Sequence, residues 1–236
     1  MPASATTKPQ SRNVPHVSER EVVISPLGLA GTLRLPALAG ALVVFAHGSG
    51  SSRFSPRNMA VANALNECGI ATLLFDLLTP DEERDRANVF DIPLLAGRLV
   101  DVVHWIDTDQ ELARLPLGMF GASTGAAAAL VAAAKLGSRV GAVVSRGGRP
   151  DLASAALDAV TAPTLLIVGG FDDVVIELNE QAFARLTAPK KIEIVPGATH
   201  LFPEPGTLKL VIEHAARWFK NHLEARERSH PNAGSR

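Results

Sequence analysis

Short apolar segments alternate along the chain with longer amphipathic or alanine-rich segments. The apolar segments predict β-strands, and most are apolar throughout, which is typical of parallel strands covered on both faces. We expect strands at 21–25, 31–35, 41–46, 71–75, 116–120, 141–145, 163–168 and 191–195, the first two as an antiparallel pair. The longer segments predict helices at 56–67, 92–106, 124–136, 151–159, 174–186 and 207–223. This alternation indicates an α/β protein with a mostly parallel, doubly wound sheet of about eight strands.

Both ends of the chain lack this pattern. Residues 1–20 are polar, rich in Ser, Thr and Pro, and have no apolar core of the kind found in secretory signals. Residues 225–236 are polar and charged. We therefore predict a disordered N-terminal tail over 1–20, a single domain over 21–224, a flexible C-terminal tail over 225–236 and a cytoplasmic location. Residues 148–163 have room for one short helix, so no large cap domain is expected, and 77–91 is the candidate for a partial cover.

Composition narrows the classes of partner. The formal net charge of −1 favours neither nucleic acid nor an anionic membrane surface. Cys68 is the single cysteine, so an internal disulfide is excluded and a reducing compartment is compatible. The histidines show no metal-ligand spacing, and we expect no metal and no cofactor; they are His16, His47, His104, His200, His214, His222 and His230.

One motif carries the candidate chemistry. Gly121-Ala122-Ser123-Thr124-Gly125 lies between an apolar segment and an alanine-rich helical segment. The pattern G-x-S-x-G at a strand-to-helix junction is typical of a sharp turn that exposes the hydroxyl of its serine as a nucleophile. Glycine is needed on either side because neighbouring backbone approaches closely there. Ser123 is therefore the candidate nucleophile.

An acid and a base follow in the chain order that this turn requires. Asp172 and Asp173 come directly after the predicted strand 163–168, where carboxylates point into the crevice at the carboxyl end of a parallel sheet. His200 lies on the loop after the last predicted strand. The order Ser, Asp, His is that of the α/β-hydrolase triad. Only one of the adjacent aspartates is expected to face His200, and the other would be a turn or N-cap residue.

With these residues in place, the chain resembles an α/β-hydrolase of the dienelactone-hydrolase-like group, from about residue 21 to residue 223. The resemblance implies that Ser123 is the nucleophile, His200 the base and Asp172 the acid. The namesake enzymes use cysteine where this chain has serine, which favours ordinary ester hydrolysis here. The matching segments are His47-Gly48-Ser49-Gly50-Ser51-Ser52-Arg53, the Ser123 motif, Ser145-Arg146-Gly147-Gly148-Arg149-Pro150-Asp151, Gly169-Gly170-Phe171-Asp172 and Gly197-Ala198-Thr199-His200.

The tetrahedral intermediate of acyl transfer needs two backbone N–H donors for its oxyanion. In this fold one comes from the residue after the nucleophile, here Thr124, and the other from the loop after the third strand. We expect Ser49 to supply the second, with Gly50 as the next choice. That loop lacks the Gly-Lys-Ser/Thr ending of a phosphate-binding loop. His47, at its start, is interpreted as a residue that fixes the loop.

Four arginines follow the carboxyl ends of strands: Arg53, Arg57, Arg146 and Arg149. Guanidinium groups suit carboxylates and phosphates, so Arg53 and Arg146 are candidates for binding an anionic substrate. The alternative, which we favour slightly, is ion pairing with Asp76, Asp151 or the acidic residues 81–83.

These observations predict a serine hydrolase that cleaves small carboxylic esters or lactones through an acyl-enzyme intermediate. An acyltransferase or a thioesterase would use the same triad. A non-catalytic ligand-binding protein could keep the fold, since fold alone does not establish activity. The expected partner is a small-molecule ester, with no nucleic acid and no membrane, and the chain is expected to be a monomer or a homodimer.

Overall fold

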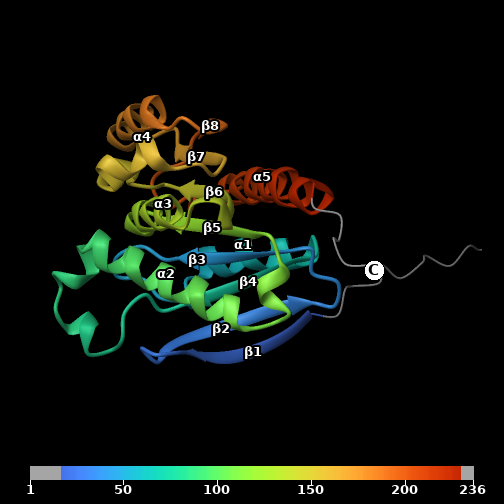
Figure 1. Cartoon of the computed structure of the whole chain (residues 1–236). Coiled ribbons are helices and arrows are strands. Elements are labelled where there is room, and N and C mark those ends of the chain that lie inside the picture. Colours follow the sequence, from blue (N-terminus) through green and yellow to red (C-terminus); the bar gives the residue numbers. More distant parts are fainter. Residues whose placement is uncertain (1–16, 230–236) are drawn as a thin grey trace, which may run out of the picture.

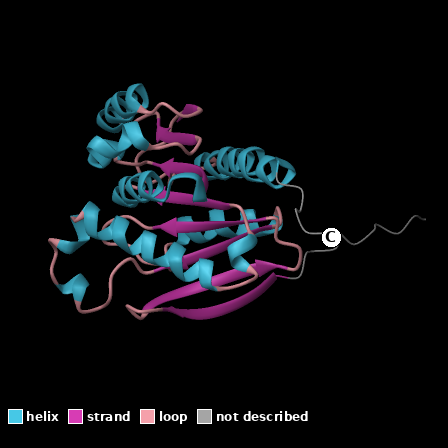
Figure 2. Cartoon of the chain, viewed as in Figure 1, coloured by secondary structure: helices cyan, strands magenta, loops and turns pink. Residues whose placement is uncertain are grey.

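Eight strands form one sheet with helices on both faces in the computed structural model, which describes residues 17–229 (Figures 1 and 2). The strands are β1 (Val17–Ile24), β2 (Leu29–Pro36), β3 (Ala41–Ala46), β4 (Ile70–Phe75), β5 (Leu117–Ala122), β6 (Val140–Arg146), β7 (Thr164–Gly169) and β8 (Lys190–Val195). The main helices are α1 (Pro56–Glu67), α2 (Ile92–Thr108), α3 (Thr124–Leu136), α4 (Asp173–Arg185) and α5 (Thr207–Ser229). Short 3₁₀ helices lie at Glu82–Arg84, Asn88–Phe90, Leu112–Arg114, Gly137–Arg139 and Pro150–Ala159.

The strand order is β1-β2-β4-β3-β5-β6-β7-β8. Strands β3 to β8 run parallel, and β1 and β2 extend the sheet antiparallel to their neighbours. This is the α/β-hydrolase fold with about eight strands that the sequence predicts. The region between β6 and β7 holds a single short 3₁₀ segment and no cap domain.

Two apolar cores sandwich the sheet. Helices α2, α3 and α4 cover one face, where alanines of α3 pack against Leu and Val of α2 and of the strands. Helices α1 and α5 cover the other face, with Phe45, Phe120 and Phe219 fully enclosed. Because strands β3 to β7 are buried on both faces, their sequences are mostly apolar rather than alternating.

Most predicted boundaries differ from the structure by one or two residues, and three predictions differ in more important ways. Strand β1 begins at Val17, so the last four residues of the predicted tail 1–20 belong to the sheet, paired with residues 33–36 of β2. Helix α5 continues to Ser229, past the predicted domain end at 224. The predicted helix 151–159 is 3₁₀ and is interrupted at Ser154, where φ is 42°. Residues 1–16 and 230–236, which contain the rest of the predicted tails, lie outside the described residues.

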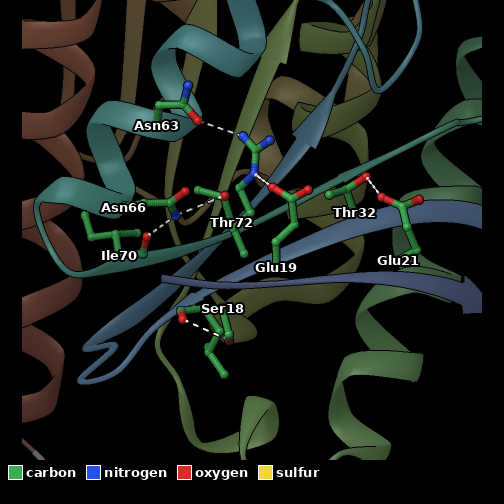
Figure 3. Close-up of polar contacts among 10 residues, drawn as sticks. Ser18, Glu19, Glu21, Thr32, Asn63, Asn66, Ile70 and Thr72 are labelled. Carbon is green, nitrogen blue, oxygen red and sulfur yellow. Dashed lines mark hydrogen bonds and ion pairs between the residues drawn. The ribbon is translucent and has the colours of Figure 1, made fainter. Parts of the chain in front are cut away.

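Polar side chains fasten the β1–β2 edge to α1 (Figure 3). Arg34 on β2 donates to Glu19 on β1 and to Asn63 on α1, both at 2.7 Å. Thr32 donates to Glu21 at 2.7 Å, and Asn66 at the end of α1 donates to the Ile70 carbonyl and the Thr72 hydroxyl. Such cross-strand contacts stabilise an edge whose outer strand is half exposed.

The parallel strands define two edges of the molecule. Their carboxyl ends meet the loops that carry Ser49, Ser123, Asp172 and His200. At the opposite, amino edge, Val17 of β1 pairs with Pro36, and Leu223 of α5 lies against Gly118 at the start of β5. The described chain thus starts and finishes on the edge away from these loops. No helix within residues 17–229 is long and apolar enough to cross a membrane.

Candidate active site

Ser123 stands on a strained turn between β5 and α3. Its φ of 51° and ψ of −122° lie outside the regions that side-chain-bearing residues usually adopt, at a typical cost of about 1–3 kcal/mol. Two neighbouring glycines make the turn sterically possible. A methyl group at Gly121 would lie 2.4 Å from the Ala126 Cα, and one at Gly125 would lie 2.4 Å from the Ala46 and His47 carbonyl oxygens. The G-x-S-x-G pattern is thus a packing requirement here.

Backbone hydrogen bonds hold this turn on both sides. The Ser123 N–H donates to the Arg146 carbonyl at 3.3 Å, and the Ser123 carbonyl accepts from the N–H groups of Ala126 and Arg149, both at 3.1 Å. A methyl group built on Gly48 would lie 3.0 Å from Ser123 Cβ. The loop after β3 therefore passes directly beside the candidate nucleophile.

Asp172 and His200 meet at the ends of β7 and β8. The distance from His200 Nδ1 to Asp172 Oδ2 is 2.7 Å, and the two side chains are 36% and 17% exposed. Asp172 occupies the N-cap position of α4 but makes no capping bond, because its carboxylate is directed to His200. Asp173 is the first residue of α4. Of the two candidate acids, the structure therefore places Asp172 on the histidine.

The loop after β3 is hydrogen-bonded to the start of α3. The Ser49 N–H donates to Thr124 Oγ1 at 2.9 Å, and Thr124 is buried. The two residues expected to supply the oxyanion donors are therefore neighbours across this bond. The Ser49 N–H is thus already hydrogen-bonded to the Thr124 hydroxyl, a feature that the sequence did not predict.

His47 fixes this loop through both ring nitrogens. Its Nε2 accepts from the Leu77 N–H at 3.2 Å, and its Nδ1 donates to the Gly48 carbonyl at 3.0 Å in the tautomer that serves both contacts. Burial lowers the pKa of His47 and outweighs the opposing effects of the Gly48 carbonyl, Asp76 and Glu83. A histidine that is neutral and fully hydrogen-bonded agrees with the structural interpretation of His47.

A cavity of about 620 Å³ opens beside the same loop. One wall is the serine-rich segment from Ser49 to Pro56, and the other comes from residues 83–90. Phe54 and Phe90, both more than half exposed, face this space, and Glu83 and Arg86 are the charged residues in its lining. The segment 77–91, predicted as a partial cover, thus forms one side of the cavity.

The candidate arginines have different partners. Arg53 forms an ion pair with Asp76 and a longer one with Glu21 at 3.6 Å, and Arg149 forms a two-pronged pair with Asp151. Both agree with the ion-pairing interpretation. Arg146 is only 4% exposed and donates to Asn58 Oδ1 at 3.0 Å. Sequence reasoning missed Asn58, which sits in the first turn of α1 with no motif around it.

Taken together, the geometry suits nucleophilic acyl transfer: a serine on a strained turn, a histidine oriented by an aspartate, and backbone amides near the serine. Within residues 17–229, no cluster of three or more His, Cys, Asp or Glu side chains has the arrangement of a metal site.

Known proteins resemble this chain over most of its described length. The model of the dienelactone hydrolase family matches residues 40–228. A crystal structure of a dienelactone hydrolase from Anabaena variabilis is 51% identical, covers 89% of this chain and 100% of its own, and superposes with a TM-score of 0.85. Carboxyl esterase 2 from Tuber melanosporum is 18% identical over 91% of this chain and 89% of its own, with a TM-score of 0.66, and shares the fold.

Two curated proteins from strains of Mycobacterium tuberculosis carry the name "Putative phosphoribosyl transferase". Each is 60% identical over 205 residues, which is 87% of this chain but 46% of the relative. The chain thus spans less than half the length of these curated relatives.

Proposed function

The chain belongs to the dienelactone hydrolase family, and from this premise we propose that it hydrolyses small carboxylic esters or lactones with Ser123 as nucleophile. The observation that carries the proposal is the Asp172–His200 hydrogen bond of 2.7 Å, in a structure that also holds the Ser123 backbone at positive φ. A serine hydroxyl is a weak nucleophile until an adjacent base removes its proton, and the base must be held in one tautomer.

The proposed reaction has two steps. Asp172 accepts the His200 Nδ1–H, which leaves Nε2 free to take the proton of Ser123 as its Oγ bonds to the acyl carbon. The proton then passes to the leaving alkoxide, the C–O bond to the alcohol breaks, and an acyl-enzyme remains. Water attacks the acyl carbon in the second step, again with His200 as base, and releases the acid and the free serine.

The oxyanion formed in each step would be bound by the N–H groups of Thr124 and Ser49. Because the Thr124 hydroxyl accepts from the Ser49 N–H, the oxyanion must share or replace that bond. The bond also keeps the loop against α3, so the donor is in place before substrate arrives. Loss of one such donor typically costs about 3–4 kcal/mol of transition-state stabilisation.

The test compares wild type with Ser123→Ala on p-nitrophenyl acetate and butyrate. We expect kcat to fall by a factor on the order of 10⁴–10⁶, because the remaining site lacks the covalent step. A fluorophosphonate probe followed by mass spectrometry should label Ser123. Ser18→Ala is the matched control, since Ser18 only donates to the Leu35 carbonyl at the far edge of the molecule. Equal turnover in both variants would contradict the proposal.

The name of the mycobacterial relatives raises a second candidate, phosphoribosyl transfer. We propose that the matched region contributes hydrolysis and that the transferase name refers to the part of those relatives outside the match. Release of pyrophosphate from phosphoribosyl pyrophosphate by this chain in the presence of nucleobases would overturn that division.

A further inference from the structure

Arg146 carries a buried positive charge without an acidic partner. It ends β6, is 4% exposed, and is the only arginine among the buried residues of the described chain. Asn58 Oδ1, a neutral acceptor, is its hydrogen-bond partner, and its Nε atom is buried with none. No carboxylate of residues 17–229 makes an ion pair with it, in contrast to Arg53, Arg98 and Arg149.

Two further positive features converge on this guanidinium. Arg57 lies next to Asn58 on α1, also has a buried Nε without a partner, and forms no ion pair with a described residue. Its charge, together with the larger effect of burial, lowers the pKa of Arg146 to about 10. The third feature is the positive end of α1, a 12-residue helix whose first turn contains Arg57 and Asn58.

Such an arrangement is unfavourable in the free protein. Burial of a charge costs free energy unless it is paired, and a second cation nearby adds repulsion. An anion at this point would compensate all three positive features at once.

We propose that Arg146, Arg57 and the first turn of α1 bind a phosphate group carried by the substrate. The proposal rests on the function proposed above and names the substrate class of the same site. Two guanidinium groups and a helix N-terminus together supply more positive charge than one carboxylate would balance, whereas a phosphate monoester dianion matches it. The chain would therefore hydrolyse carboxylic esters whose acyl or alcohol part bears a phosphate.

The position relative to the triad supports this assignment. The Arg146 carbonyl accepts from the Ser123 N–H, so the strand that carries the guanidinium also fixes the nucleophile. The next residue, Gly147, lies so close to His200 that an added methyl group would be 2.9 Å from the His200 carbonyl oxygen. The Phe202 ring, two residues past His200, is centred 6.0 Å from Arg146 Cζ. The cation thus sits beneath the loops of nucleophile and base.

The kinetic test uses three p-nitrophenyl esters of similar size: a phosphonopropionate, a hemisuccinate and the neutral methyl succinate. Wild type should favour the phosphonate over the neutral ester by about 10-fold or more in kcat/KM, since charge-assisted hydrogen bonds contribute on this scale. Arg146→Met and Arg57→Met should remove that preference, so that kcat/KM falls more for the phosphonate than for the neutral ester. Arg146→Lys should restore part of it. Equal losses on all three esters, or preference for the hemisuccinate, would overturn the proposal.

Arg149→Met is the matched control, because Arg149 lies three residues away and has its own acid, Asp151. It should keep the phosphonate preference. Should Arg146→Met fail to fold, the half-buried Arg57 supplies the same test.

A second readout does not depend on catalysis. In the Ser123→Ala protein, inorganic phosphate should raise Tm by several degrees at fixed ionic strength, since ligand bound only to the folded state stabilises it. Sodium chloride at equal ionic strength should not, and Arg57→Met should abolish the shift. No shift in Ser123→Ala would overturn the phosphate site. A shift with no ester turnover in wild type would instead sustain the site and reject the hydrolase.

Discussion

Arg53 and Arg146 both lie at the carboxyl edge of the sheet near the start of α1, but their charges are balanced differently. Arg53 forms ion pairs with Asp76 and Glu21, so carboxylates of the protein itself balance its charge. Arg146 meets Asn58, a side chain of similar shape to aspartate but without its charge. The difference teaches that residue type alone does not separate a structural arginine from a binding one. The charge of what the side chain touches makes that distinction.

The largest expected effect on stability comes from removing the acid that pairs with Arg53. Asp76 accepts from the Arg53 N–H at 2.8 Å and pairs with its guanidinium. In Asp76→Asn the largely buried guanidinium loses its nearest anion, and we expect the free energy of unfolding to fall by about 2 kcal/mol. Urea denaturation should show a lower midpoint at an unchanged m-value. An unchanged midpoint would mean that the Glu21 pair alone balances Arg53.

The comparison can be reversed by giving Arg146 an acid of its own. In Asn58→Asp the carboxylate would pair with Arg146 and also lie in the first turn of α1, where negative charge is favoured. We expect an increase of about 1 kcal/mol in the free energy of unfolding in phosphate-free buffer. The Tm rise with phosphate should become smaller, because the new carboxylate balances part of the positive charge of the site. A destabilised Asn58→Asp protein would contradict the view that Arg146 lacks a counter-charge.

A smaller effect on the free energy of unfolding should appear as pH falls, and it should come from His47. The pKa of His47 in the folded state is lowered by burial from its usual value of 6.5. Well above pH 6.5 the histidine is neutral in both states, so His47 adds no pH dependence there. Below it the unfolded chain gains a proton that the folded state resists, so stability should fall with decreasing pH until the folded-state pKa is reached.

The loss between pH 7 and pH 5.5 should be on the order of 1 kcal/mol. Urea denaturation at both pH values measures it, and His47→Asn should show a smaller pH effect than wild type. His222, whose pKa burial also lowers, remains in both proteins and cancels in this difference. An identical pH effect in the two proteins would show that folding does not lower the pKa of His47.

Local pattern was enough for most of the fold. The buried strands are mostly apolar and the helices carry caps such as Ser55 before Pro56, so their type and order followed from sequence. Strand β1 was predicted to start too late because its outer residues are polar and exposed, as suits an edge strand. The kink at Ser154 depends on a single backbone conformation that the helical composition of 150–159 does not reveal.

The site divides in the same manner. Ser123, Asp172 and His200 sit in local motifs at strand ends, and the resemblance named them. The Ser49–Thr124 bond joins residues 75 positions apart, and the Arg146–Asn58 bond spans 88. Neither pair has a sequence signature. Each bond forms because tertiary packing brings α3 to the loop after β3 and α1 to the end of β6. From the sequence, Arg146 could therefore be named as a candidate for anion binding, but it could not be distinguished from Arg53.

The placement of Val17 and of the last turns of α5 on the amino edge has a practical consequence. An affinity tag, surface tether or fused enzyme joined directly before Val17 or after Ser229 would enter the described domain from the edge opposite the triad loops (Figure 1). Immobilised protein should therefore present its carboxyl-edge loops to the solution. The points at which the described domain can be attached to another body and the loops that carry the triad residues thus lie on opposite edges of the sheet.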